Sequence, residues 1–289
     1  MALVVQARAK INLSLDVLAR RPDGFHEVRM VMQSIDLHDR LEFAPAMNLS
    51  LASDHPQLPI DERNDIIRAA RLLQMRYAVS DGARIHLIKK IPVAAGMAGG
   101  STDGAAALWG LNRLWGLGLE NEQLQALAAE LGSDMPFCVV GGTALASGRG
   151  ERLTDLPPAP TLDLVLMKPD FGVSTKSVYG GLELDRLPPS ATDQMVELIR
   201  QRDRDGVIRG LANHLETVTF ALYPALSDRR QKAMDLGALN CRMSGSGPTL
   251  FAVARDEQHA HELAAQLQSP GWWVQVAQTA PRGLTIESP

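Results

Sequence analysis

A lysine and an aspartate stand in apolar surroundings at two distant points of the chain. Lys10 lies within small and apolar residues 9–13, whose alternation is typical of a strand. Asp134 follows Gly132 at a break in the pattern and has apolar neighbours on both sides. Because an isolated buried charge is costly, we predict that the two residues pair. The ammonium would keep the carboxylate ionised to accept a hydroxyl proton, and would offset charge on a phosphoryl group in transfer.

Both residues also fit an ordinary structural explanation. Lys10 and Asn12 are two positions apart and share one strand face, which solvent could cover. Asp134 could stabilise the turn between Gly132 and Pro136, as aspartates near glycine and proline commonly do. The residue types alone leave these alternatives open.

A glycine-rich stretch, residues 92–106, joins a predicted strand to a predicted helix. Its glycines remove side chains where backbone N–H groups could surround an anion, and the start of a helix favours a phosphate. Ser101 and Thr102 are predicted N-cap residues, and Asp103 suits a first helical turn. The stretch is neither a Walker loop nor a GxGxxG motif. An ordinary glycine-rich connector remains the alternative.

Two further motifs could contact a ligand. Phe25 and His26 follow a turn at residues 20–24, so they could stack on and hydrogen-bond to a planar ring, or simply end a hairpin. A second glycine-rich turn, residues 244–247, lies between two predicted strands. Together with the first glycine-rich stretch it could approach a phosphate from the opposite side.

The cysteines and histidines do not form a zinc pattern. Cys138 and Cys241 have no CxxC spacing, and we interpret them as buried thiols of a reducing cytoplasm. His259 and His261 are two apart on a predicted helix and are expected at the surface. The chain has no HExxH motif, so structural zinc is not expected.

Composition indicates a globular protein with an aliphatic core. The 289 residues are 45% hydrophobic but only 4% aromatic, and the net charge is -4. That charge argues against a general binder of nucleic acid or membrane surfaces. The N-terminus lacks the pattern of a signal peptide, and no apolar run reaches the roughly 18 residues of a membrane span. We therefore expect a cytoplasmic protein.

Periodicity predicts mixed strands and helices, and hence an α+β fold. Strands are expected at residues 3–18, 28–35, 39–43, 83–90, 137–145, 162–167, 238–243, 249–253 and 272–278. Helices are expected at residues 105–115, 121–131, 174–179, 192–200, 215–222 and 227–236, with two more capped by Asn64 and Asp256. The proline-rich residues 156–161 indicate a boundary between domains 1–156 and 157–289, although they could be only a stiff loop.

Taken together, the motifs resemble the GHMP small-molecule kinases. The matching segments, in one order, are residues 7–17, 21–27, 92–106, 131–137 and 243–249. The resemblance implies a two-domain α+β fold with the active site in the inter-domain cleft. It also implies transfer of the γ-phosphoryl group of ATP, with Mg²⁺, to the 2-hydroxyl of a cytidylyl-methylerythritol in non-mevalonate isoprenoid precursor biosynthesis.

The same resemblance implies roles for individual residues. Lys10 and Asp134 would be the catalytic pair, and Lys89 would contact the nucleotide. The ATP phosphates would lie on Pro92, Val93, Ala94, Ala95, Gly96, Met97, Ala98, Gly99, Gly100, Ser101 and Thr102. The acceptor would contact Asn12, Phe25, His26 and Thr175. Phe25 stands where the family usually has tyrosine, which keeps ring stacking and loses a hydroxyl contact.

Two other functions stay open at this point. A sister kinase of the same superfamily would act on homoserine or a mevalonate-pathway alcohol, which has no base to stack on Phe25 and His26. A nucleotide-binding regulator would have lost catalysis, although both Lys10 and Asp134 are present. The expected partners are a small-molecule substrate, no nucleic acid and no membrane, with the chain a monomer or weak homodimer.

Overall fold

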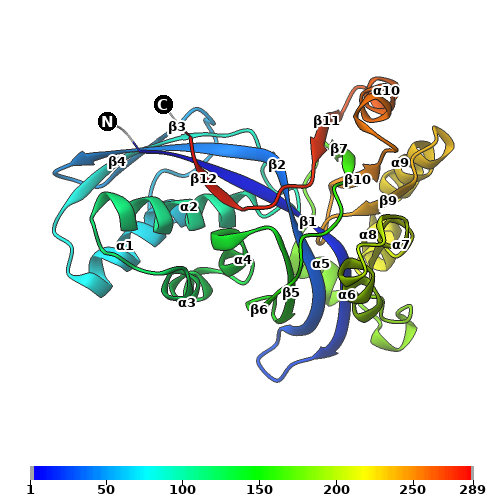
Figure 1. Ribbon diagram of the computed structural model, residues 1–289, viewed down its shortest axis with the longest axis horizontal. Helices are drawn as coiled ribbons and strands as arrows, with labels where there is room; N and C mark the ends of the chain where they lie inside the picture. Colours follow the sequence, from blue (N-terminus) through cyan, green and yellow to red (C-terminus); the bar gives the residue numbers. More distant parts are fainter. Residues whose placement is uncertain (1–2, 288–289) are drawn as a thin grey trace.

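One long antiparallel hairpin organises the molecule. The computed structural model describes residues 3–287, and its first two strands are β1 (Leu3–Arg20) and β2 (His26–Ala46) (Figure 1). They pair from Leu3 opposite Phe43 to Arg20 opposite His26. The predicted separation of residues 28–35 from 39–43 is wrong, because the pairing continues through β-bulges that bend the ribbon without interrupting it.

The hairpin lies in an eight-stranded sheet with the order β12-β1-β2-β4-β3 along its main path. Beside β2, β5 and then β6 extend it, and β8 pairs with β1. The added strands are β3 (Ser50–Ser53), β4 (Gly82–Ile88), β5 (Thr143–Gly148), β6 (Arg152–Asp155), β8 (Ala212–Asn213) and β12 (Leu284–Ile286). Strands from both ends of the chain therefore flank β1.

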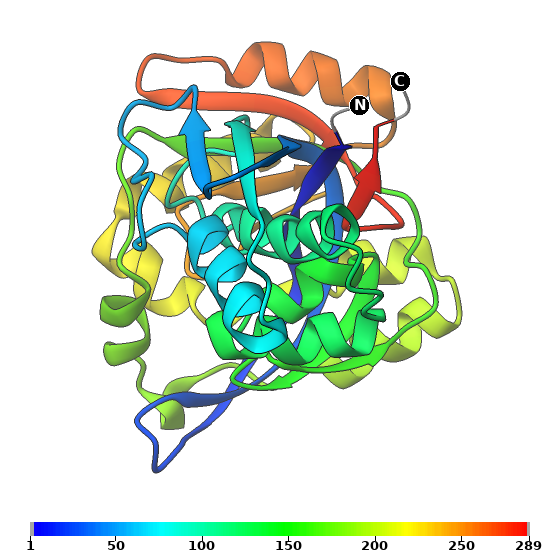
Figure 2. The ribbon, with the colours of Figure 1, turned by 90° about the vertical axis from the view of Figure 1, so that its left-hand side faces the viewer.

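Four helices cover one face of this sheet (Figures 1 and 2). They are α1 (Asp65–Tyr77), α2 (Gly99–Leu114), α3 (Asn121–Leu131) and α4 (Met135–Val140). The Asn64 side chain accepts a hydrogen bond from the Ile66 N–H, which confirms the predicted cap of α1. The predicted caps of α2 are wrong: Ala98 is the N-cap, with φ 57°, so Ser101 and Thr102 lie inside the first turn.

The expected strand at residues 137–145 is also wrong in its first half. That half is the short helix α4, because Pro136 fits a first helical turn and has no N–H to lose. Gly141, with φ +67°, ends the helix in a conformation that glycine adopts easily, and β5 begins at Thr143. This arrangement leaves Asp134 at the N-terminus of α4.

The second sheet has the order β11-β7-β10-β9 and lies at the other end of the molecule (Figure 1). Its strands are β7 (Asp163–Pro169), β9 (Asn240–Met243), β10 (Leu250–Val253) and β11 (Trp272–Gln278). Its helices are α5 (Thr175–Gly180), η1 (Leu184–Arg186), α6 (Thr192–Arg200), α7 (Arg204–Arg209), α8 (Glu216–Leu222), α9 (Pro224–Asp235) and α10 (Glu257–Leu267). The mixture of elements confirms the α+β class.

The structure confirms the prediction for the cysteines and contradicts the prediction for His259. Cys138 and Cys241 are buried free thiols, as expected. His259 is buried, not at the surface, because its Nδ1 accepts the Arg255 N–H at 3.1 Å at the start of α10. Within residues 3–287, no helix has the length and apolarity that crossing a bilayer requires.

The proline-rich residues 156–161 lie between β6 and β7, where the chain passes from the first sheet to the second. We propose this point as the boundary between domains 1–156 and 157–289. β8 and β12 then return from the second domain to pair with β1. The two domains are therefore joined by strand pairing as well as by one linker.

Candidate active site

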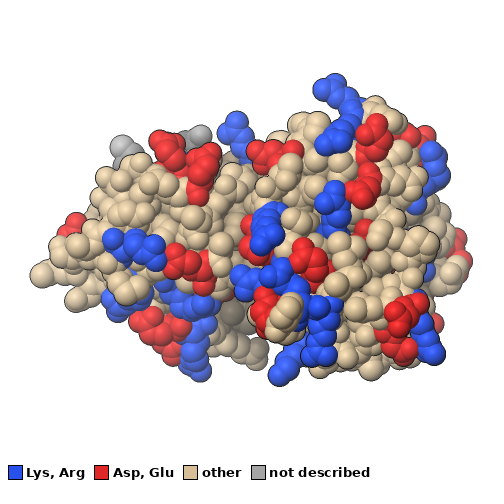
Figure 3. Space-filling model, turned by 90° about the horizontal axis from the view of Figure 1, so that it is seen from below, with Lys and Arg blue, Asp and Glu red and all other residues tan. Residues whose placement is uncertain are grey.

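A cleft of about 1200 Å³ is lined by residues from both halves of the chain. One wall comes from β1, the turn after it, α1 and the glycine-rich loop, residues 92–98. The other comes from α5 and the turn at residues 244–247. Figure 3 shows Lys and Arg side chains gathered near the middle of the molecule's lower face. The cleft agrees with the site that the sequence led us to expect between two domains.

Lys10 and Asp134 meet in this cleft. Lys10 Nζ is 3.3 Å from Asp134 Oδ2, and both residues line the cleft. The lysine side chain is 4% exposed and the aspartate side chain 32% exposed. The Lys10 backbone N–H donates to the Met97 carbonyl at 3.2 Å, so the strand carrying the lysine is bonded to the glycine-rich loop. A partly open carboxylate beside a buried ammonium can accept a proton from a bound alcohol.

Asn12 lies behind Lys10 and does not line the cleft in this structure. Its Oδ1 accepts hydrogen bonds from Lys10 Nζ at 2.9 Å and from the Gly245 N–H at 3.0 Å. Asn12 thereby joins β1 to the second glycine-rich turn. A contact between Asn12 and the acceptor stays a prediction.

Carbonyl groups of the glycine-rich loop accept hydrogen bonds from the second half of the chain. The Ala95 carbonyl accepts the Thr249 N–H at 3.3 Å, and the Gly96 carbonyl accepts the Ser244 hydroxyl at 2.9 Å. The N–H groups of the first turn of α2 have no partner within the helix and lie beside the loop. Free N–H groups at a helix start form a site for phosphate oxygens.

Lys89 lies directly beneath this loop. Its ammonium contacts Asp39, and it is 3.2 Å from Asp103 Oδ2. A Cβ added to Gly99 would lie 2.9 Å from Lys89 Nζ, so the lysine supports the loop from below. Asp39 Oδ1 also accepts the N–H groups of Lys90 at 2.6 Å and Ile91 at 2.8 Å.

The buried charges of Lys89 and Asp103 act on each other's pKa. Burial disfavours charge on Lys89, but attraction by Asp103 and Asp39 outweighs it and raises the pKa of the ammonium. Burial and the neighbouring Asp39 raise the pKa of Asp103 well above its ordinary value, despite the attraction of Lys89. Lys89 is thus held as a cation below the loop.

Phe25, His26 and Thr175 also line the cleft. The His26 and Tyr179 rings lie 5.2 Å apart at 34°, and the Thr175 hydroxyl is 2.9 Å from that of Ser246. Burial, followed by the charge of Arg20, lowers the pKa of His26, so the imidazole is neutral near neutral pH. The cleft wall therefore carries aromatic rings and neutral hydrogen-bonding groups at these residues.

The residues at the start of α2 fit a magnesium ion bound together with phosphate. Mg²⁺ takes oxygen ligands, usually one or two from protein, with the rest from phosphate and water. Ser101 lines the cleft, and within residues 3–287 the buried Asp103 Oδ1 has no hydrogen-bond partner. We note Ser101 and Asp103 as the oxygen donors that would hold the ion.

The structure thus brings most of the predicted residues together in one cleft. Those lining it are Lys10, Phe25, His26, Lys89, Pro92, Val93, Ala94, Ala95, Gly96, Ala98, Gly99, Gly100, Ser101, Asp134 and Thr175. Met97, within the loop, and Thr102, in the first turns of α2, are buried and do not line the cleft. The sequence reasoning missed Asp39, because its neighbours His38 and Arg40 are polar and it lacks the apolar surroundings that marked Lys10. It also missed Tyr179, whose helix was predicted without a reason to choose that residue.

Two family models match the chain. The model described as "GHMP kinases N terminal domain" matches residues 64–142, and "GHMP kinases C terminal" matches residues 195–271. A 4-diphosphocytidyl-2-C-methyl-D-erythritol kinase from Pelotomaculum thermopropionicum is 49% identical, covering 96% of this chain and 98% of its own. One from Bacillus cytotoxicus is 46% identical, covering 91% and 92%.

Solved structures agree with these relatives. A crystal structure of 4-(cytidine 5'-diphospho)-2C-methyl-D-erythritol kinase has a TM-score of 0.81 at 33% identity, covering 96% of this chain and 99% of its own. A homoserine kinase from Cytophaga hutchinsonii has a TM-score of 0.77 at 22% identity, covering 99% and 97%, which shows a shared fold alone. The chain belongs to the GHMP kinases and, within them, to the 4-diphosphocytidyl-2-C-methyl-D-erythritol kinase family.

Proposed function

We propose that this chain transfers the γ-phosphoryl group of ATP to the 2-hydroxyl of 4-diphosphocytidyl-2-C-methyl-D-erythritol. The reaction is a step of non-mevalonate isoprenoid precursor biosynthesis. The observation that carries the proposal is the Lys10–Asp134 ion pair, which lies in one cleft with both the glycine-rich loop and the Phe25–His26 turn. The transfer needs a site for the ATP phosphates, a base for the acceptor hydroxyl and a site for the cytosine ring, and these three features would supply them in that order: the loop, the ion pair and the Phe25–His26 turn.

In the proposed mechanism, Asp134 is the general base. Its carboxylate accepts the proton of the acceptor hydroxyl while that oxygen bonds to the γ-phosphorus, and the bond to the β,γ-bridging oxygen breaks to release ADP. Lys10 holds Asp134 in place through their ion pair and stabilises charge on the transferred group. The loop amides and the start of α2 hold the β- and γ-phosphates, with Lys89 as a fixed cation beneath them.

We also propose Mg²⁺ as the metal that accompanies ATP, held by Ser101 and Asp103. When bound, it neutralises phosphate charge and orients the phosphate groups for in-line transfer. This chain's own contribution at that point is to present oxygen atoms at the start of α2 beside the cleft.

A panel of alcohols tests the function. The purified protein is incubated with Mg-ATP and, separately, with 4-diphosphocytidyl-2-C-methyl-D-erythritol, homoserine or mevalonate, and ADP release and product mass are measured. We expect turnover with the cytidylyl acceptor alone. Turnover with homoserine or mevalonate instead would assign a sister kinase, and ATP binding without transfer to any of them would assign a regulator.

We further propose that the protein works in the cytoplasm as a monomer or weak homodimer, with neither nucleic acid nor membrane as a partner. Support comes from the net charge of -4 and from the absence, within residues 3–287, of a helix fit to cross a membrane. Sedimentation across a concentration series measures the assembly state directly.

A further inference from the structure

The turn between β5 and β6, residues 148–151, lies at the acceptor end of the cleft and has no role in the mechanism above. Its backbone approaches the general base: a Cβ added to Gly150 would lie 3.7 Å from Asp134 Oδ1. The side chain of Arg149, the residue before Gly150, reaches Phe25: its guanidinium carbon is 5.1 Å from the centroid of the Phe25 ring. One short turn therefore extends from the general base Asp134 to the Phe25 ring, which would stack on the cytosine of the acceptor.

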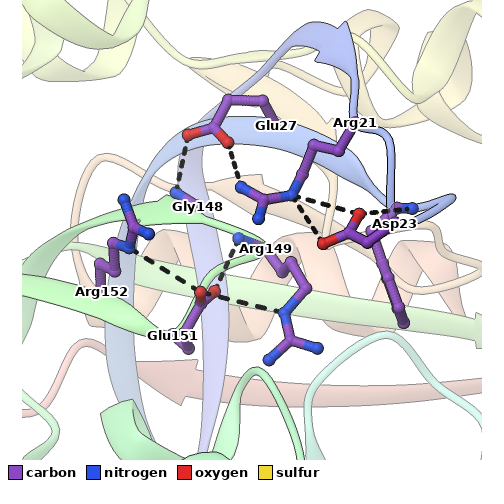
Figure 4. Close-up of polar contacts among 8 residues, drawn as sticks. Arg21, Asp23, Glu27, Gly148, Arg149, Glu151 and Arg152 are labelled. Atoms are coloured by element: carbon purple, nitrogen blue, oxygen red, sulfur yellow. Dashed lines mark hydrogen bonds and ion pairs between the residues drawn. The ribbon is translucent and has the colours of Figure 1, made fainter.

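Two carboxylates hold this turn in position. Glu27 Oε1 accepts the Gly148 N–H at 3.1 Å, and its Oε2 accepts from Arg21 Nη1 at 2.5 Å. Glu151 Oε2 accepts the Arg149 N–H at 2.6 Å. Figure 4 shows Glu27 between Arg21 and Gly148, and Glu151 between Arg149 and Arg152. The turn is consequently fastened to the hairpin that carries Phe25 and His26.

The Arg149 guanidinium makes one long ion pair, with Glu151, within residues 3–287. Within residues 3–287 it donates no hydrogen bond, and its Nε is 3.9 Å from Glu151 Oε1. Its side chain is 34% exposed and lines the cleft. Lys10 and Lys89 lie closer to their carboxylate partners, at 3.3 Å from Asp134 and 3.2 Å from Asp103. Arg149 thus offers the cleft a positive charge with several free N–H donors.

We propose that Arg149 binds the diphosphate of the acceptor and is a specificity-determining residue for this kinase. The inference rests on the proposed function. An acceptor with its base at Phe25 and His26, and its hydroxyl at Asp134, must run its diphosphate between them, past Arg149. The guanidinium fork matches phosphate oxygens in a bidentate geometry. Its position over one face of Phe25 leaves the other face for the base.

The test compares Arg149→Gln with Arg152→Gln. Arg152 is a matched control because it faces the same carboxylate, with its Nε 4.0 Å from Glu151 Oε1, yet its side chain is 70% exposed and does not line the cleft. Arg149→Gln should raise the KM for the cytidylyl acceptor by about 10- to 100-fold. The KM for ATP should stay unchanged, Arg149→Lys should recover part of the loss, and Arg152→Gln should behave as wild type. An unchanged acceptor KM in Arg149→Gln would overturn the proposal.

Calorimetric titration with CDP and with cytidine separates a diphosphate contact from support of the ring. Arg149→Gln should weaken CDP binding by the same factor as the acceptor KM and leave cytidine binding unchanged. Equal weakening of both ligands would overturn the proposal, because the arginine would then act only on the ring. If the wild-type protein transfers no phosphoryl group to the acceptor, the proposed function fails, while the two titrations still decide the role of Arg149.

Discussion

Lys10 and Asp134 acquire their proposed roles from different neighbours. The lysine is buried, bonded to Asn12, and its backbone is tied to the glycine-rich loop. The aspartate precedes α4 and keeps a third of its side chain open to the cleft. A fixed cation beside an accessible carboxylate suits a base that must meet a substrate without losing its charge.

Asp134→Asn tests the proposed role of Asp134 as the general base. The amide keeps the size of the side chain but cannot accept the hydroxyl proton, so kcat should fall by about 100-fold or more while ATP binding stays nearly intact. Steady-state kinetics and ATP titration measure the two effects. Asp155→Asn, on the exposed end of β6, serves as the control and should match wild type. Near-normal turnover in Asp134→Asn would remove the residue from the role of base.

His26 makes acceptor binding depend on pH. Burial, followed by the charge of Arg20, lowers the pKa of His26 below its ordinary value of about 6.5. The ring therefore stays neutral as the pH falls past that value, and the acceptor KM should rise only at lower pH. Because the unfolded chain binds the proton more readily, this group costs folding stability as the pH falls through its unfolded pKa.

Arg20→Gln provides the comparison for His26. Removing the nearby positive charge should raise the pKa of His26 and move the change in acceptor KM to higher pH. An NMR titration of the His26 ring proton measures the pKa in both proteins. An identical pKa in the two would show that Arg20 does not act on this ring.

At the scale of elements, the glycine-rich loop depends on the second glycine-rich turn, residues 244–247. Gly96 has φ +74°, and a Cβ there would lie 2.4 Å from the Ser244 carbonyl oxygen and 2.8 Å from that of Gly247. No side chain fits at this position without moving backbone. The two turns are therefore packed together at the point where the two domains meet.

Gly96→Ala should consequently damage both stability and ATP use. We expect a loss of about 1–3 kcal/mol in the free energy of unfolding, from the left-handed backbone and the contact together, and a raised KM for ATP. Gly132→Ala is the control, because its φ of -174° suits any residue and the space around it is open. Equal unfolding free energies for the two variants, measured by urea denaturation, would contradict the packing argument.

The sequence predicted most elements but not all of the contacts between them. Local sequence patterns located α3, α6 and β11 to the residue. The motif order led to Lys10 and Asp134, which the structure brings within 3.3 Å. The start of α2 was misjudged because Ala98 adopts a left-handed conformation that composition does not reveal. Asp39 was missed because its partners, residues 89–91, follow the end of β4, far along the chain.

At the scale of the molecule, Asp16 joins the first sheet to elements of the second domain. The buried carboxylate accepts the N–H groups of Ala191 at 3.1 Å and Thr192 at 2.9 Å, at the start of α6. It also lies 3.4 Å from His214 Nε2, while His214 Nδ1 accepts the Val17 N–H. These contacts fix the helix and the histidine to β1.

Asp16→Ala should therefore destabilise the whole protein. Removing the carboxylate leaves buried donors without partners, and we expect a loss of about 3 kcal/mol in the free energy of unfolding. Asp193 lies on α6 and is an exposed ion-pair partner of Arg29 in β2. Asp193→Ala should lower the free energy of unfolding by less than about 1 kcal/mol. Denaturant unfolding measures both. A loss in Asp16→Ala no larger than that in Asp193→Ala would refute the role of this junction.

The hairpin of β1 and β2 has one more consequence for the proposed kinase. It carries Lys10 opposite Ser34 at one point and Arg20 opposite His26 near its turn, so the pairing fixes how far the reacting centre lies from the ring-binding end. Each extended residue adds about 3.3 Å, and shortening both strands by two residues would bring the ends about 7 Å closer without exchanging the strand faces. On the proposed function, the hairpin would favour an acceptor whose length matches this distance.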